Sequence, residues 1–197
     1  RGSTQTTYTK EPQEIINYTS AHDNYILWDQ VLAKASINNT SMEEKIRMQT
    51  LALSIIGLSQ GIPFFHAGDE ILISKSGDGD SYDSGDLFNA IDFSYESNNW
   101  GIGLPPEWRN KNEWNFWEKR LTNKTLNVSQ EQILTNLANF HRILKIRKSS
   151  KLFRLDTSND IRERVSFLEN EDFTNNEIIN SPIAGIISMY VSDKNFS

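Results

Sequence analysis

The sequence lacks cysteine and has only three histidines among its 197 residues. Without cysteine the protein cannot form disulfides, use a thiol nucleophile or bind zinc through thiolates, although such chains occur both inside and outside the cell. The histidines, His22, His66 and His141, are far apart in the sequence, and His141 falls within an expected helix. A zinc site is therefore not expected, and no metal-ligating residues are predicted.

Long apolar runs and clusters of positive charge are also missing. No run approaches the roughly 18 apolar residues of a membrane-spanning helix, and residues 1–10 lack the apolar core of a secretory signal. The net charge is −6, so nucleic-acid phosphates would be repelled. Neither a membrane nor a nucleic acid is an expected partner. Because the chain begins with Arg1 instead of Met, we expect it to be a piece of a longer protein whose compartment stays open.

Two short apolar segments run into polar residues. Residues 15–24 (IINYTSAHDN) contain His22 and Asp23, and residues 61–70 (GIPFFHAGDE) end in acidic side chains. A helical pattern lies between them, and strand, helix, strand is the βαβ arrangement of a parallel sheet. Because α/β barrels carry their chemistry at the carboxyl ends of strands, His22 and Asp23 are candidate active-site residues. A His-Asp dipeptide also occurs by chance, so the neighbouring segments carry much of the argument.

Two helices are predicted from capping boxes, in which a serine and an acidic or amide side chain three residues later satisfy each other's backbone N–H groups. These boxes are residues 41–44 (SMEE) and 129–132 (SQEQ). Apolar residues then recur at helical spacing and predict one buried face for each helix. The first face comprises Met48, Leu51, Ile55 and Leu58, and the second comprises Ile133, Leu137, Phe140 and Leu144.

Residues 74–106 read as a long loop in which acidic, amide and aromatic side chains alternate. Carboxylates and amides bind sugar hydroxyls and flat rings stack on pyranoses, so the loop suits a carbohydrate, although a solvated loop anchored by aromatics has the same composition. Beyond residue 150 the chain changes to short β-type runs, LFRL, RVSFL and GIISMYV, separated by turns rich in Asn and Asp. They predict a second, all-β domain.

Other chemistries fit less well. Residues 78–86 (DGDSYDSGD) suggest an EF-hand, but counting from Asp80 the twelfth position is Ile91 instead of the required Glu. A looser structural calcium site stays compatible with the sequence. Metal phosphohydrolases also use a His-Asp pair, but in an all-helical fold with further ligands. There is no glycine-rich phosphate loop, serine-hydrolase elbow or dinucleotide fingerprint.

Several segments together resemble one family: residues 17–24 (NYTSAHDN), 47–72 (RMQTLALSIIGLSQGIPFFHAGDEIL), 80–93 (DSYDSGDLFNAIDF), 98–106 (NNWGIGLPP) and 144–155 (LKIRKSSKLFRL). In these segments the chain resembles the C-terminal part of the pullulanase and plant-type limit dextrinase group of the α-amylase superfamily, glycoside hydrolase family 13. These enzymes hydrolyse α-1,6 branch linkages in starch, pullulan and limit dextrins. The NNWGIGLPP segment looks closer to the plant-type enzymes.

The resemblance implies an α/β fold followed by an all-β one. Residues 1–150 would supply the last two βα units of a (β/α)8 TIM barrel, and residues 151–197 the start of a C-terminal antiparallel β-sandwich, cut short at the end of the chain. The family implies no required cofactor. It implies a plastid location if the source is plant or algal, and a secreted or cytosolic one otherwise.

The resemblance also assigns roles to single residues. Asp23 matches the family's third catalytic carboxylate, which stabilises the positively charged transition state, while His22 and Asn24 would bind the same sugar. Asp80 matches an acidic residue that holds the glucan chain, with Tyr82 close by. The family pattern has Arg immediately before that Asp, whereas this chain has Gly79.

The nucleophile and general acid of a retaining glycosidase are not in this sequence. In the family both lie on earlier barrel strands, upstream of Arg1, so we expect this polypeptide by itself to be inactive and not to fold stably. One alternative is a non-catalytic glucan-binding or scaffold relative. Another is an isoamylase-type or branching specificity, against which residues 80–106 argue.

Overall fold

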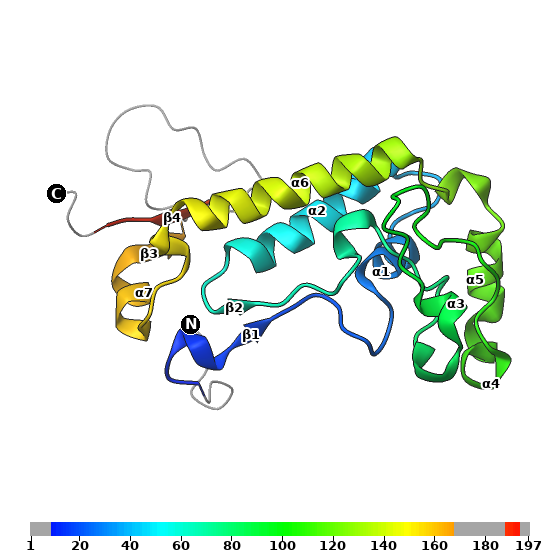
Figure 1. Cartoon of the computed structure of the whole chain (residues 1–197), viewed down its shortest axis with the longest axis horizontal. Coiled ribbons are helices and arrows are strands. Elements are labelled where there is room, and N and C mark those ends of the chain that lie inside the picture. The colour runs from blue at the N-terminus through cyan, green and yellow to red at the C-terminus, as the bar shows by residue number, and fades with distance from the viewer. Residues whose placement is uncertain (1–8, 168–187, 194–197) are drawn as a thin grey trace. The chain divides into compact units, whose positions relative to one another are not determined.

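The computed structural model describes residues 9–167 and 188–193 (Figure 1). The chain divides into two compact units. The terminal unit comprises Arg1–Ile16, Gln60–Ile62 and Lys148–Ser197, and the central unit comprises Asn17–Ser59 and Pro63–Arg147. The boundary passes through two short strands, β1 (Ile16–Asn17) and β2 (Ile62–Pro63), and close to the end of helix α6 (Gln130–Ser149). The sequence-based boundary after residue 150 stays a prediction.

The central unit is built from helices and long connections. Besides α6, its α-helices are α1 (Leu27–Lys34), α2 (Met42–Leu58), α3 (Asp86–Asn89), α4 (Glu107–Asn110) and α5 (Trp114–Leu121). Its 3-10 turns are Asp69–Ile71, Ser81–Asp83, Lys111–Glu113 and Lys124–Leu126.

Strands β1 and β2 pair in the same direction. The N–H of Ile62 donates to the carbonyl of Ile15 at 3.0 Å, and the N–H of Phe64 donates to the carbonyl of Asn17 at 2.8 Å. Both numbers rise together along the pair, as in a parallel ladder. The two apolar segments therefore pair as predicted, with α2 between them in the sequence.

The first strand is shorter than predicted. It ends at Asn17, so the prediction that it continues to His22 is wrong. Beyond Asn17 a side-chain contact takes the place of strand pairing: the hydroxyl of Ser20 donates to the buried carboxylate of Asp69. In the described part of the chain the strands form two sheets of two strands each, β1–β2 and β3–β4. The barrel and the sandwich stay predictions.

Both predicted capping boxes are confirmed. The N–H of Glu44 donates to Ser41 Oγ at 3.1 Å, and the N–H of Ser41 donates to the Glu44 carboxylate at 2.7 Å. At the start of α6, Ser129 and Gln132 make the same reciprocal pair, at 2.9 and 3.3 Å. Each pair satisfies two N–H groups that a helix start leaves without an intrahelical acceptor.

The buried faces of these helices differ from the predicted ones. In α2 the side chains of Met48, Leu51 and Ile55 are 44%, 59% and 52% exposed, whereas Ile46, Gln49, Leu53 and Ile56 are buried. In α6 Ile133 is buried as predicted, but Leu144 is exposed and Ile143 is buried. Both helices are apolar on more than one side, so spacing alone cannot choose which side packs.

The core of the central unit forms where α1 and α2 meet their neighbours. One cluster joins buried residues of α1 and α2 to the connections: Trp28, Leu32, Ile46, Leu72 and Leu126. The other joins α1, α2 and α6: Leu27, Leu53 and Ile143. Helices α2 and α6 lie side by side (Figure 1), and a Cβ added at Gly57 would lie 2.3 Å from Ile143 Cγ2. Arg147 of α6 donates to the carbonyls of Gly57 and Ser59 and thereby caps the end of α2.

The terminal unit contains 3-10 turns at Pro12–Glu14 and Lys151–Phe153, helix α7 (Ser158–Arg164) and strands β3 (Val165–Phe167) and β4 (Met189–Val191). Strands β3 and β4 are antiparallel, with Ser166 opposite Tyr190. They confirm the predicted RVSFL and GIISMYV strands within the described residues, and the rest of these segments lies outside them. The predicted strand LFRL is wrong, because the Ser150 side chain accepts from the Leu152 N–H and favours a 3-10 turn there.

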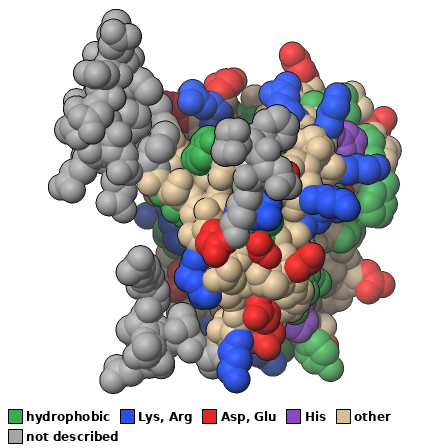
Figure 2. Space-filling view, turned by 90° about the vertical axis from the view of Figure 1, so that its left-hand side faces the viewer, with side chains coloured by type: hydrophobic (Ala, Val, Ile, Leu, Met, Phe, Trp, Pro, Cys, Tyr) green, Lys and Arg blue, Asp and Glu red, His purple; other side chains and the backbone are tan. Residues whose placement is uncertain are grey.

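Acidic and basic side chains stand next to one another on the face drawn in Figure 2. Among the described residues, no helix is sufficiently long and apolar to cross a membrane.

Candidate functional site

The turn that follows β1 presents His22 and Asp23 to solvent. Their side chains are 88% and 75% exposed, and His22 Nδ1 lies 3.9 Å from Asp23 Oδ2. Asn24 has a φ of +63°, a left-handed conformation that asparagine adopts more readily than most residues. The turn thus holds a carboxylate in the open, where it can approach a bound molecule.

Hydrogen bonds between buried polar groups hold this turn in place. Ser20 Oγ lies 3.1 Å from both carboxylate oxygens of Asp69, to which it donates. The main-chain carbonyl of Asp69 accepts from Gln49 of α2 and Asn136 of α6, both at 3.1 Å. Burial raises the pKa of Asp69 to about 7. Two long helices therefore fix the point from which the His22–Asp23 turn starts.

A second anchor comes from the loop after residue 73. The ammonium group of Lys75 donates to the main-chain carbonyl of His22 at 3.0 Å, and burial lowers the pKa of Lys75. Asp29 of α1 holds this loop in turn: its carboxylate accepts from Ser74 Oγ at 2.5 Å and from the N–H groups of Lys75 and Gly77 at 2.9 and 3.1 Å. Burial raises the pKa of Asp29 to about 6.

Gly77 is required by the packing at the same place. Its φ is +77°, and an added Cβ would lie 2.2 Å from the ring of Trp117. Trp117 is completely buried and packs edge-on against Tyr25 at 5.1 Å, with its Nε1 donating to the Tyr25 hydroxyl at 3.2 Å. The loop, α5 and the residue following Asn24 therefore form one packed support.

Asn24 and Asp80 line the same cleft, of about 460 Å³. The other lining residues are Tyr25, Gly79, Arg109, Asn110 and Glu113. The structure thus brings together two predicted sugar-binding residues that are far apart in the sequence. His22, Asp23 and Tyr82 are not among its lining residues within the described part of the chain, and Tyr82 is 90% exposed.

Helix α4 completes the cleft. Arg109 forms an ion pair with Asp80. Asn110 Nδ2 donates to Asp78 Oδ1 at 3.2 Å, and Asp78 Oδ1 also accepts from the N–H of Asp80 at 2.9 Å. Sequence reasoning missed Arg109, Asn110, Lys75 and Asp29. No local motif marks them, because their partners are distant in the chain.

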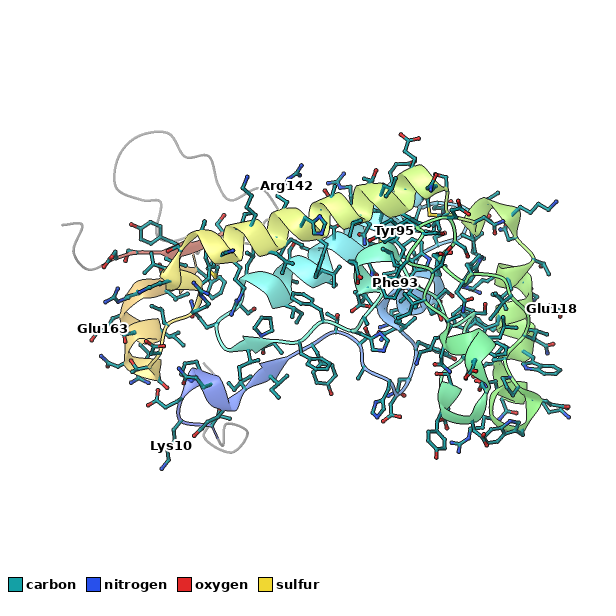
Figure 3. The ribbon with its side chains drawn as sticks, viewed as in Figure 1. Lys10, Phe93, Tyr95, Glu118, Arg142 and Glu163 are labelled. Carbon is teal, nitrogen blue, oxygen red and sulfur yellow. The ribbon has the colours of Figure 1, made fainter. Side chains whose placement is uncertain are left out.

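The composition of residues 74–106 was compatible with a sugar-binding loop and with a loop anchored by aromatic side chains. The structure contains an aromatic side chain that suits each. Trp100 packs against the α1–α2 core cluster and lies 6.3 Å from Trp117, so it anchors the loop. Phe93, labelled in Figure 3, is 65% exposed and is available to a flat ligand.

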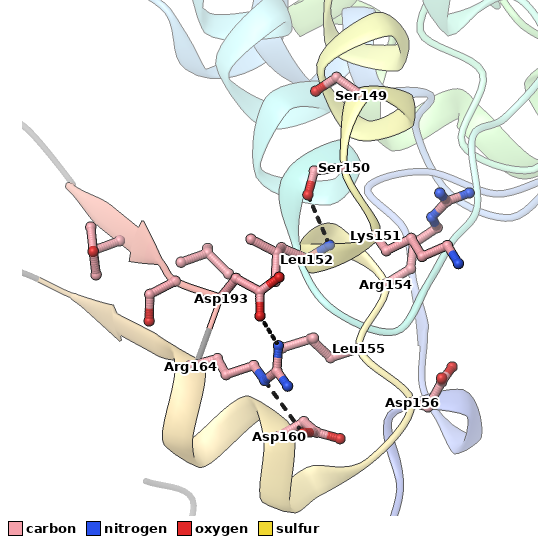
Figure 4. A pocket seen from close by; sticks show the side chains of 13 residues that line it. Ser149, Ser150, Lys151, Leu152, Arg154, Leu155, Asp156, Asp160, Arg164 and Asp193 are labelled. Atoms are coloured by element: carbon pink, nitrogen blue, oxygen red, sulfur yellow. Dashed lines mark hydrogen bonds and ion pairs between the residues drawn. The ribbon is translucent and has the colours of Figure 1, made fainter. Parts of the chain in front are cut away.

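A larger cavity, of about 1160 Å³, lies in the terminal unit (Figure 4). Its lining includes Arg164, which pairs with Asp160 at 3.4 Å and with Asp193 at 3.2 Å. These pairs satisfy the charge of the guanidinium. None of the predicted site residues is among the described residues that line it.

Within residues 9–167 and 188–193, no group of three or more histidine and acidic side chains is arranged to hold a metal ion. A looser calcium site is compatible with the sequence but is not predicted by it.

Comparison with known proteins gives the chain a family. Residues 95–196 match the family described as alpha-1,6-glucosidases, pullulanase-type, C-terminal. The chain belongs to the pullulanase-type family. Among its relatives, the chloroplastic pullulanase 1 of Arabidopsis thaliana is 52% identical over 165 residues, which is 84% of this chain and 17% of the relative. The pullulanase of Klebsiella pneumoniae is 36% identical over 162 residues, or 81% of this chain and 14% of that protein.

Solved pullulanases share the structure. The crystal structure of Klebsiella pneumoniae pullulanase complexed with maltotriose matches with a TM-score of 0.77 and 35% identity, covering 83% of this chain and 15% of that chain. The pullulanase of Bacillus acidopullulyticus matches with a TM-score of 0.58 and 28% identity, covering 82% of this chain and 15% of that one. The pullulanase-type chain thus spans about one sixth of the relatives that it matches.

Proposed function

We propose that this chain works as the C-terminal part of a starch-debranching enzyme that hydrolyses α-1,6-glucosidic linkages in pullulan, amylopectin or limit dextrins. Membership of the pullulanase-type family supports the reaction class. The observation that carries the proposal is the exposed carboxylate of Asp23, which stands on a turn held by hydrogen bonds from Ser20 and Lys75. A firmly placed carboxylate is what stabilisation of a sugar cation needs.

In this proposal Asp23 stabilises the oxocarbenium-like transition state of a double displacement that retains the anomeric configuration. His22 and Asn24 bind the reacting glucose beside it. Asp80 holds the glucan chain at the neighbouring cleft, and Tyr82, which is exposed and does not line that cleft, binds the chain close by. Carboxyl groups and water perform such a reaction, so it requires no cofactor.

The nucleophile and general acid would come from the part of the enzyme that precedes this chain. In a retaining glycosidase these two carboxyl groups stand about 5 to 5.5 Å apart. The chain spans only 17% of the Arabidopsis thaliana relative, which leaves ample length for them. We therefore propose that the chain by itself does not hydrolyse glucan.

The preceding part would also complete the barrel. We propose that β1 and β2 are two strands of a (β/α)8 barrel and that residues 151–197 begin a β-sandwich. Parallel pairing of β1 with β2 supports the barrel, and antiparallel β3–β4 pairing supports the sandwich. The exposed apolar side chains of Met48, Leu51 and Ile55 on α2 offer a surface on which a neighbouring helix can pack.

The test is the change Asp23→Asn in the full-length protein, with pullulan as substrate. We expect turnover to fall by at least about 1000-fold, with maltotriose binding largely retained, because the carboxylate acts mainly in the transition state. Glu118→Gln is the matched control, since this exposed carboxylate on α5 points away from the ribbon (Figure 3). Near-normal turnover of Asp23→Asn would exclude the assigned role.

Product analysis separates related functions. Release of maltotriose from pullulan would support debranching, whereas new branch points would indicate a branching enzyme. Glucan binding without hydrolysis by the full-length protein would favour a non-catalytic relative. The 52% identity to a chloroplastic pullulanase supports a plastid location if the source is a plant or an alga.

A further inference from the structure

We propose that Arg109 is a positioning residue of the glucan-binding cleft, which orients the carboxylate of Asp80 toward sugar hydroxyls. The inference rests on the proposed function and extends it to a residue that has no role in that function as stated above. Arg109 and Asp80 form an ion pair, and both line the cleft that contains Asn24.

The guanidinium also contacts an aromatic ring. Its Cζ lies 4.5 Å from the ring centroid of Trp108, a cation–π contact that restricts the side chain. Trp108 is itself 57% exposed. The next residue, Asn110, bonds to Asp78 at 3.2 Å and accepts from the N–H of Gly79 at 3.4 Å. Helix α4 therefore clamps the loop that carries Asp80 through two consecutive side chains.

The exposure of the pair suits a binding surface. The side chains of Arg109 and Asp80 are 43% and 34% exposed, so each has polar atoms that a ligand can reach. A guanidinium presents five N–H donors in a planar fork, and a carboxylate presents acceptors only. Together they complement the paired donors and acceptors of neighbouring sugar hydroxyls.

Gly79 provides a way to test the role directly. A Cβ added there would find Tyr25 Cε1 as its nearest neighbour, at 3.2 Å, so a side chain requires only a small movement of the Tyr25 ring. An arginine at this position adjoins Asp80 in the sequence. It can therefore supply the positive charge from the loop itself when Arg109 has been removed.

The experiment measures kcat and KM on pullulan, and the dissociation constant for maltotriose, in the full-length protein. We expect Arg109→Gln to raise KM and the dissociation constant by about three- to five-fold, the range typical of an exposed ion pair, with kcat nearly unchanged. Arg109→Lys should retain most of the affinity. Gly79→Arg in the Arg109→Gln background should restore it.

Two further measurements distinguish positioning from folding. The difference in KM between the native protein and Arg109→Gln should narrow at high salt, which screens the pair. Lys111→Ala is the matched control, because Lys111 forms an exposed pair with Glu107 on the same segment, at 2.6 Å. It should leave KM and the dissociation constant unchanged.

The outcomes separate the two proposals. Unchanged KM and maltotriose affinity in Arg109→Gln would overturn the role of Arg109 while leaving debranching intact. If the native full-length protein binds maltotriose without hydrolysing pullulan, the proposed function fails and the affinity measurements still decide on Arg109. If it neither binds nor hydrolyses, both proposals are overturned.

Discussion

The hydroxyl of Ser20 lies 3.1 Å from both carboxylate oxygens of Asp69. Ser20 is in the turn after β1, and Asp69 is the first residue of a 3-10 turn after β2, so this contact joins the two connections. Both side chains are buried, with exposed fractions of 4% and 1%. Their pairing places His22 and Asp23 relative to helices α2 and α6, because Gln49 and Asn136 bind the carbonyl of the same Asp69.

Removing this hydroxyl should destabilise the protein. Ser20→Ala leaves the buried carboxyl of Asp69 without its side-chain donor, which typically costs about 1–3 kcal/mol. We expect the free energy of unfolding of the full-length protein to fall by this amount in denaturant titration. Ser166→Ala, at an exposed serine of β3, is the control and should change it by less than about 0.5 kcal/mol. Equal effects of the two variants would contradict the role of Ser20.

The pKa of Asp69 predicts a pH dependence of stability. Burial raises it from 3.8 in the unfolded chain to about 7 in the folded protein, so the folded state holds the proton more tightly. The contribution to stability is complete below about pH 4 and is lost as the pH rises to about 7, by at most about 4 kcal/mol. Asp69→Asn, which does not titrate, should show a flatter profile of melting temperature between pH 4 and 7.

The comparison between these two profiles is the measurement, because other groups titrate in both proteins. Asp29, whose pKa burial raises to about 6, contributes in the same direction to each. Parallel profiles for the native protein and Asp69→Asn would exclude a raised pKa at Asp69.

Alanine substitutions at two glycines distinguish the cost of backbone strain from the cost of steric overlap. Gly77→Ala places a methyl group 2.2 Å from the Trp117 ring at a φ of +77°, whereas Gly85→Ala at a φ of +86° has no atom within 4 Å. We expect Gly85→Ala to cost about 1–3 kcal/mol of unfolding free energy from the backbone alone, because a φ of +86° with a ψ of 167° suits only glycine, and Gly77→Ala to cost at least about 2 kcal/mol more.

The same two variants test whether packing of Trp117 supports the cleft. Displacement of Trp117 should also move Tyr25, so Gly77→Ala should raise KM on pullulan while Gly85→Ala should not. Similar unfolding free energies for the two variants would show that the loop at Gly77 and the Trp117 ring can move apart without loss of stability.

The helix starts were predictable because a capping box is complete within four consecutive residues. Ser41 with Glu44, and Ser129 with Gln132, make their bonds wherever the chain allows a helix. The buried face of α2 was not predictable. Its apolar residues occur on several sides, and contact with α1 and α6 buries Leu53 while Leu51 stays 59% exposed.

The residues of the candidate site were also predictable only in part. The carboxylate at Asp23 and the acidic loop at Asp80 could be named from the sequence, because the resemblance is carried by contiguous segments. The residues that hold Asp23 and Asp80 in place could not be named from the sequence. Asp29, Lys75 and Arg109 act on partners far away in the chain, and no spacing rule connects such positions.

The sequence by itself determined the helix starts, the pairing of two apolar segments in a parallel sense and the chemical groups of the candidate site. These follow from interactions between near neighbours and from residues that lie together in short segments of the chain. Only the tertiary structure decided where the first strand ends, which helix faces are buried and that Asp80 meets Arg109. Those depend on packing between distant segments, whose free energy exists only once the chain has folded.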